Sequence, residues 1–130
     1  MEHNIQILID NLILKSKGAL NSAEFNFINE HYETCQNRLY YAIFYVVSAL
    51  AYKDNFITSK HSQLMGWFNK KYIYDNKIFD SKMFAIYKEA YTNRQKSDYD
   101  FTYEPEKDEI FAMIEDTKLF VNTIKKYLEC

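Results

Sequence analysis

Three short stretches of this sequence carry side chains of the kinds that bind or react with phosphate groups. They are Arg38 with Tyr40 and Tyr41, then His61, and finally Asn93 and Arg94 with Asp98 and Tyr99. A guanidinium group holds a phosphate with two parallel hydrogen bonds, a histidine exchanges protons near neutral pH, and a tyrosine stacks on bases or donates a hydrogen bond. We therefore treat these residues as candidates for binding or for catalysis.

The scarcity of arginine sharpens this interpretation. Of the sixteen basic side chains, only Arg38 and Arg94 are arginines. A chain that otherwise uses lysine for positive charge, yet keeps two arginines, suggests sites that need the planar fork of the guanidinium group. Chance combined with ordinary ion pairing is the alternative explanation.

Each candidate also has an ordinary structural explanation. Arg94 is expected in the last turn of a helix, where it would satisfy the helix dipole and pair with Asp98. Arg38 would pack its stem at the end of a bundle and keep its head in solvent. Tyr41 would be a core aromatic residue with a solvent-exposed hydroxyl, and His61 would be a partly buried histidine at the start of a helix. No second histidine or cysteine has metal-ligand spacing, so the sequence predicts neither a metal nor another cofactor.

The elements around these residues are predicted to be helices. Residues 37–51 are apolar most of the way round a helix, which is typical of the central helix of a bundle. Before it, a helix is expected from Asn4 to about Glu30. Lys17 and Gly18 form a weak point in it, and Asn21 could cap a second piece, so one helix and two helices both remain open.

The second half of the chain predicts three more helices. A short helix should begin after Thr58 or Ser59 and end near Lys70 and Lys71. A fourth helix is expected from about Phe79 to Gln95, whereas residues 96–104 have no sustained helical period. Pro105 fits the first position of a last amphipathic helix.

With one proline and two glycines, the chain is predicted to be all-α. The expected architecture is an antiparallel up-down bundle of four main helices plus one short helix, forming a single domain over residues 1–130. The formal net charge of −2 excludes a uniformly basic nucleic-acid binder, although a local cluster of cations could still bind phosphate. Without a signal peptide or a membrane-spanning apolar run, we expect a cytoplasmic protein with free thiols at Cys35 and Cys130.

The order and spacing of these pieces resemble the HEPN superfamily of small helical domains. The similar branch is prokaryotic and has three marks: an Arg-x-Tyr-Tyr-Ala helix, a histidine that opens a short helix, and an Arg-x-x-x-Asp-Tyr element. The corresponding residues here are Arg38 to Ala42, His61, and Arg94 to Tyr99. The resemblance extends over roughly residues 5–128.

The resemblance implies a helical bundle that is usually homodimeric and is often paired with a minimal nucleotidyltransferase in a toxin–antitoxin-like module. Active members cut RNA without metal, using an Arg-x(4–6)-His element brought together from two protomers. In this sequence the positions for that histidine are Tyr99, Asp100 and Phe101. General acid–base catalysis typically raises the reaction rate roughly 10²–10⁴-fold. Without that histidine, the chain would be a binding protein or a weak enzyme unless another residue takes its role.

Three hypotheses follow. The first is an RNA- or nucleotide-binding module, homodimeric, with a nucleotidyltransferase-like partner, in which Arg38, Tyr41, Asn93, Arg94 and Asp98 form the binding site. The second is a metal-independent ribonuclease in which Arg94 holds the phosphate and His61 or Tyr99 handles protons. The third is a purely structural protein-interaction domain whose polar residues only stabilise the ends of the bundle. The first two require the remote arginines to meet in one polar cleft.

Overall fold

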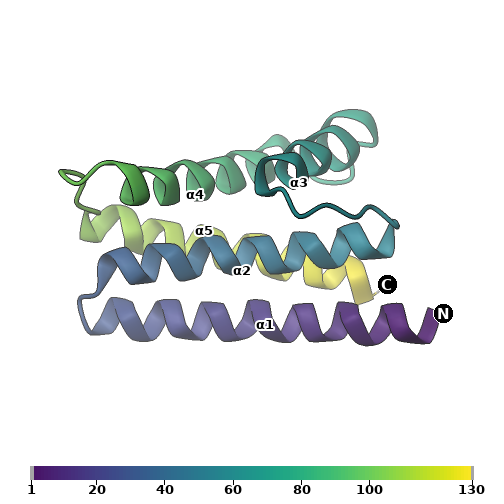
Figure 1. Ribbon diagram of the computed structural model, residues 1–130, viewed down its shortest axis with the longest axis horizontal. Helices are drawn as coiled ribbons and strands as arrows, with labels where there is room; N and C mark the ends of the chain where they lie inside the picture. The colour runs from purple at the N-terminus through teal and green to yellow at the C-terminus, as the bar shows by residue number, and fades with distance from the viewer. Residues whose placement is uncertain (1, 130) are drawn as a thin grey trace.

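The computed structural model describes residues 2–129, and within them it contains helices and no strand. The helices are α1 (Glu2–Ile28), α2 (Tyr32–Lys53), α3 (His61–Phe68), the π-helix η1 (Asn69–Asp75), α4 (Ser81–Tyr99) and α5 (Lys107–Glu129). The long helices α1, α2, α4 and α5 alternate in direction along the molecule (Figure 1). The predicted all-α up-down bundle of four main helices with one short α-helix is confirmed.

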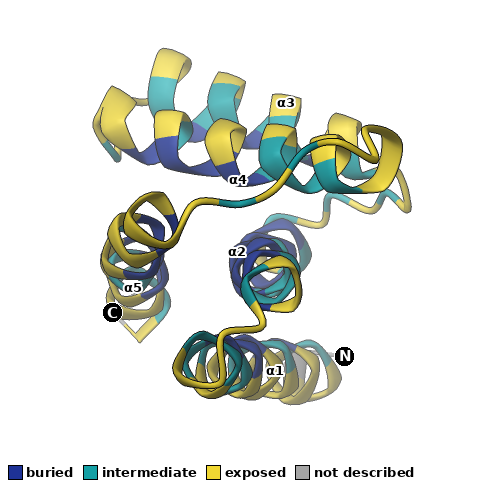
Figure 2. Cartoon of the chain, turned by 90° about the vertical axis from the view of Figure 1, so that its left-hand side faces the viewer, coloured by how far each residue is buried: buried dark blue, intermediate teal, exposed yellow. Residues whose placement is uncertain are grey.

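Helix α2 lies at the centre of the bundle and contacts α1, α3, α4 and α5. Figure 2 shows α1, α2 and α5 nearly end-on, with α3 and α4 lying across one side of them. Because α2 is apolar on most of its circumference, it can bury side chains against neighbours in every direction. Its fully buried side chains include Leu39, Tyr40, Ile43, Val46, Val47 and Leu50. The central-helix prediction is therefore confirmed.

The first helix is continuous. It passes through Lys17 and Gly18 without a break, and Asn21 lies inside it rather than starting a second piece. A side chain added at Gly18 would meet no other atom within 4 Å, so the glycine serves no close approach of another element. Packing along α2 keeps α1 helical at a position where propensity alone is weak.

The short third helix differs from the prediction at both ends. Its N-cap is Lys60, whose side chain makes no capping bond, rather than Thr58 or Ser59. The hydroxyl of Thr58 instead accepts the backbone N–H of Lys60 at 3.1 Å within the preceding loop. The chain also does not stop at Lys70 and Lys71, because it widens after Phe68 into the π-helix η1.

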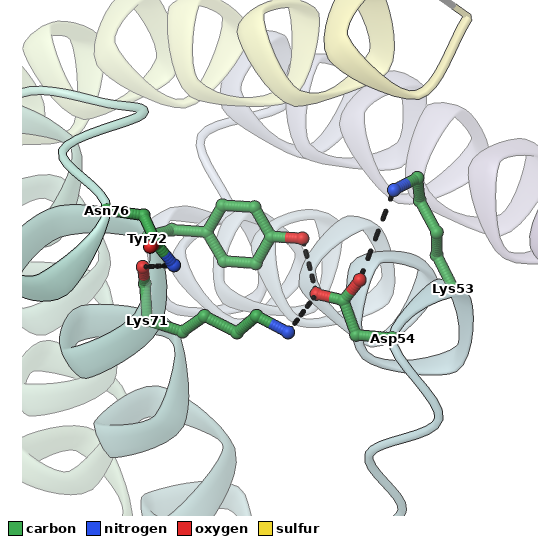
Figure 3. A network of polar contacts seen from close by, with 5 residues as sticks. All are labelled: Lys53, Asp54, Lys71, Tyr72 and Asn76. Atoms are coloured by element: carbon green, nitrogen blue, oxygen red, sulfur yellow. Dashed lines mark hydrogen bonds and ion pairs between the residues drawn. The ribbon is translucent and has the colours of Figure 1, made fainter.

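A polar network fixes the π-helix to the end of α2 (Figure 3). The hydroxyl of Tyr72 donates a 2.5 Å hydrogen bond to Asp54, and the ammonium of Lys71 lies 3.2 Å from the same carboxylate oxygen. Lys53 approaches the other oxygen of Asp54 at 4.0 Å, and the side-chain amide of Asn76 donates to the carbonyl of Lys71 at 2.9 Å. These contacts anchor the segment that precedes α4 and help to set where α4 lies against α2.

The fourth helix is longer than predicted. It starts after Asp80, whose carboxylate accepts the backbone N–H of Lys82 at 2.9 Å, and continues beyond Gln95 to Tyr99. The prediction that residues 96–104 are all non-helical is wrong for the first four of them. The last helix starts at Lys107, two residues after Pro105. In the described part of the chain, no helix is long and apolar enough to span a membrane.

Candidate functional site

The structure gathers side chains from three helices into one cluster of aromatic rings and cations. Helix α2 supplies Arg38, Tyr40, Tyr41 and Phe44, the first residue of α3 is His61, and α4 supplies Arg94. We call these six residues the cation–aromatic cluster. From the start of α3, His61 contacts the middle of α2, where Tyr40 and Phe44 lie one turn apart on the same face. Residues distant in the sequence therefore share one site.

His61 is held in place by two contacts with α2. Its Nδ1 lies 2.7 Å from the hydroxyl oxygen of the fully buried Tyr40, which is a hydrogen bond. Its ring also stacks on Phe44, with centroids 4.2 Å apart and planes inclined by 16°. Together the contacts fix the position of the imidazole and leave its Nε2 as the nitrogen that this bond does not use.

The surroundings set the charge of the two hydrogen-bonded groups. Burial, followed by the nearby Arg94 cation, lowers the pKa of His61 below its ordinary 6.5. Burial raises the pKa of Tyr40, and Arg94 only partly opposes that rise. Tyr40 therefore keeps its proton at neutral pH and can donate a hydrogen bond to Nδ1, and in that tautomer the neutral imidazole carries its own proton on Nε2. In this state Nε2 of His61 can donate a hydrogen bond, whereas proton donation requires the imidazolium form.

Both arginines lie against the ring of Tyr41. The guanidinium carbons of Arg38 and Arg94 are each 5.4 Å from its centroid, and that of Arg94 is also 4.9 Å from the centroid of Tyr40. Contacts of this kind attract a cation to the ring face. Within residues 2–129 neither arginine forms an ion pair with a carboxylate, and the Nε of Arg94 is buried without a hydrogen-bond partner. The cluster thus holds two positive charges that the described chain does not neutralise.

The other predicted site residues lie outside this cluster. Because α4 continues past Arg94, Tyr99 is five residues further along the same helix, about 140° around its axis. Tyr99 is 80% exposed, and Asp98 is exposed and does not pair with Arg94. Asn93 faces a different surface, which it lines with Lys96 and Glu109. The prediction that Arg94 occupies the last helical turn is wrong, and its expected pairing with Asp98 does not occur.

The sequence reasoning left two members of the cluster out of the candidate site. Tyr40 was one of the initial candidates but was not included in the hypothetical binding or catalytic site, and Phe44 was treated only as part of the apolar helix over residues 37–51. Their spacing holds the missing signal, because residues four apart on a helix share a face, and the face of Tyr40 and Tyr41 continues at Phe44. No metal-binding group of three or more His, Cys, Asp or Glu side chains occurs in the described range 2–129.

The fold is an all-α up-down bundle, and arginine, tyrosine and histidine side chains meet between α2, α3 and α4. These two features define a class of small helical domain with a site that attracts anions. Comparison with known proteins identifies this class. A family model described as "HEPN domain" matches residues 9–127. The chain belongs to this family.

Curated relatives agree with this assignment. A Methanocaldococcus jannaschii protein named "Putative toxin MJ0142" is 34% identical over 128 residues, which cover 98% of this chain and 86% of the relative. A second protein of that organism, "Putative toxin MJ0605", is 30% identical over 130 residues, which cover 99% of this chain and 95% of the relative. A Thermotoga maritima "UPF0332 protein" is 29% identical over 115 residues, covering 88% and 86%.

Proposed function

We propose that this chain is a toxin-like HEPN module that binds RNA or a nucleotide at the cation–aromatic cluster. Arg38 and Arg94 would hold a phosphate group, and the half-buried ring of Tyr41 would contact the adjacent base. The observation that carries the proposal is that two guanidinium groups share one tyrosine ring while neither is paired with a carboxylate of the described residues.

Electrostatics favours an anion at this place. Two like charges held near one ring repel each other, and partial burial strengthens that repulsion relative to water. A phosphate group between them would relieve the repulsion and accept hydrogen bonds from both forks. Hydrogen bonds that involve a charged group contribute about 1.5–3 kcal/mol each, so an occupied site would be considerably more favourable than an empty one.

The wider assignment rests on the family. Two of the relatives carry the word toxin in their names, and we propose the corresponding role for this chain, as a homodimer that works with a nucleotidyltransferase-like partner protein. One end of the bundle supports such assembly, because it exposes large apolar side chains from α1, α4, α5 and the loop before α5. These side chains are Phe25, Ile28, Tyr99, Phe101 and Phe111. Sedimentation of the purified protein, alone and with the product of a neighbouring gene, tests both associations.

The binding proposal is tested by fluorescence anisotropy with a labelled single-stranded RNA. Arg94→Met and Arg38→Met should each weaken binding by roughly 10- to 100-fold, the equivalent of one charged hydrogen-bonded contact. Lys118→Met serves as the matched control, because Lys118 pairs with Glu24 and Glu115 away from the cluster. Equal affinities for all four proteins would contradict the proposal.

The second candidate function is metal-independent RNA cleavage, and the Tyr40–His61 hydrogen bond is the observation in its favour. In this candidate the imidazolium form of His61 would protonate the leaving 5′-oxygen from Nε2 while water takes the 2′-hydroxyl proton, and Arg94 would balance the charge that develops on the phosphate. Because the pKa of His61 is lowered, that form is scarce at neutral pH. Tyr99, the other proton-handling candidate, is exposed and would have to enter the site from a second copy of the chain.

Cleavage is tested by incubating the protein with labelled RNA in excess chelator. An enzyme that works as described should lose activity in both Arg94→Met and His61→Gln. Cleavage that survives both substitutions would identify a contaminant, and no cleavage by the parent would exclude this candidate while leaving the binding function intact. The third hypothesis, a purely structural role, loses support because neither arginine forms an ion pair with a carboxylate in the part of the chain that the structure describes.

A further inference from the structure

The ring contacts of the cation–aromatic cluster continue beyond Tyr41 toward α1. Tyr45 lies next on the same face of α2, with its ring centroid 5.8 Å from that of Tyr41 and 5.9 Å from that of Phe44. The ammonium of Lys15 from α1 lies over the ring of Tyr45, 5.7 Å from its centroid. Tyr45 is half-buried and Lys15 is exposed, so both are open to a ligand. A pair of one cation and one partly exposed ring thus adjoins the first site.

The described acidic side chains of α1 pair with or face other parts of the molecule than Lys15. Within residues 2–129 Lys15 forms no ion pair. The acidic residues of α1 with described side chains face α5 instead, because Asp10 lines a groove there with Lys125, and Glu24 pairs with Lys118. The side of α1 that meets Tyr45 is therefore electrostatically suited to a phosphate.

We infer that Tyr45 and Lys15 form a second nucleotide subsite, at which Tyr45 stacks a base and Lys15 binds its phosphate. This inference rests on the proposed function and extends it, because it makes the ligand a single strand of at least two nucleotides that runs from Arg94 across Tyr41 onto α1. Aromatic rings in a positively charged groove are the common means of binding single strands. The 5.8 Å between the rings exceeds the roughly 3.4 Å rise of a stacked duplex strand, so each base stacks on its own ring.

The test compares adenosine monophosphate with oligoadenylates of two, three and four nucleotides, titrated into the protein and followed by NMR. The parent should bind the dinucleotide or trinucleotide roughly 5- to 100-fold more tightly than the mononucleotide, the gain expected from one stacked base. Tyr45→Leu, which keeps bulk but loses the flat ring, should retain mononucleotide affinity and lose this gain. Tyr45→Phe should retain both.

Lys15 has a matched control in the same helix. Lys15→Ala should reduce the slope of log affinity against log salt by about 0.7 for the longer oligonucleotides, as expected for one lost phosphate contact. Lys17→Ala removes the same charge two residues away, on the side of α1 that faces the groove with α5, and should leave the slope unchanged. Circular dichroism spectra confirm that each variant is folded before its binding is compared.

The outcomes separate this inference from the proposed function. If Tyr45→Leu binds every oligonucleotide as the parent does, the second subsite does not exist and the Arg94 site stands. If neither the mononucleotide nor any oligonucleotide binds the parent, the proposed function fails and the inference fails with it. If Tyr45→Leu lowers the sedimenting mass, this face is an interface between copies of the chain, which also overturns the inference.

Discussion

Replacing Tyr40 with phenylalanine removes a single buried oxygen atom from the centre of the site. That hydroxyl donates to His61 Nδ1 over 2.7 Å, and the Tyr40 side chain is fully buried. A hydrogen bond of this kind contributes about 0.5–1.5 kcal/mol net, so Tyr40→Phe should lower the free energy of unfolding by about 1 kcal/mol. For a chain of this size, the loss corresponds to roughly 4 °C in Tm.

The same substitution should change how stability depends on pH. Because the folded protein holds the pKa of His61 below 6.5, the unfolded chain takes up a proton first as the pH falls. Stability from this histidine is therefore complete above about pH 6.5 and is lost as the pH drops through the pKa of the folded state. Without the Tyr40 hydroxyl, the neutral imidazole loses its donor, and the pKa of His61 rises. Tyr40→Phe should thus reduce the loss of stability below pH 6.5.

Urea denaturation at several pH values and NMR titration of the His61 ring protons measure both effects. Tyr91→Phe is the matched control, because the Tyr91 ring also contacts Tyr40. The hydroxyl of Tyr91, however, accepts an exposed hydrogen bond from the side-chain amide of Gln95. If Tyr40→Phe is as stable as Tyr91→Phe and the pKa of His61 does not move, Tyr40 does not donate to His61 as we describe.

Three further predictions concern other parts of the bundle. Asp54→Ala should lower the free energy of unfolding by about 2 kcal/mol in urea titrations, because it leaves the Tyr72 hydroxyl without its charged acceptor, and a loss below 0.5 kcal/mol would contradict this. Gly18→Ala should stabilise the protein by about 0.5–1 kcal/mol, since the added methyl group meets no atom within 4 Å, and destabilisation would show a hidden contact. In a Cys130→Ser variant, Cys35 should resist thiol reagents until the protein unfolds, because burial raises its pKa to about 12, and rapid native labelling would contradict its buried placement.

The sequence contained enough information for the fold but not for all helix ends. The central helix could be predicted because residues 37–51 are apolar over most of a helical circumference, which is typical of a helix buried on all sides. The π-helix could not be predicted from a local pattern, because the hydrogen bond from Tyr72 to Asp54 that holds it is a tertiary contact between separate elements. The continuation of α4 to Tyr99 was also missed, because local preference in a polar segment says little about a helix that packing extends.

The candidate site was predicted in part. Arg38, Tyr41, His61 and Arg94 were selected by residue type, and the structure brings them together around Tyr41 and Tyr40. Asn93, Asp98 and Tyr99 were selected on the assumption that the helix ended near Gln95, so Asn93 was expected in its last turn and the other two on the loop that follows. Helical geometry places Asn93 and Tyr99 on other sides of α4, whereas Asp98 lies one turn from Arg94 and is exposed and not paired with it. The error in one helix end therefore changed where Asp98 and Tyr99 were expected to lie.

The central claim is that the two unpaired guanidinium groups form one anion site, and the sequence provides a direct way to test it. Because Arg38 and Arg94 are the only arginines, protein labelled with ¹⁵N-arginine should give two Nε–H signals in a mildly acidic NMR sample. We predict that adding a short single-stranded RNA shifts both signals with the same dissociation constant. Binding of the RNA that moves backbone amide signals while leaving both arginine signals unchanged would contradict the account.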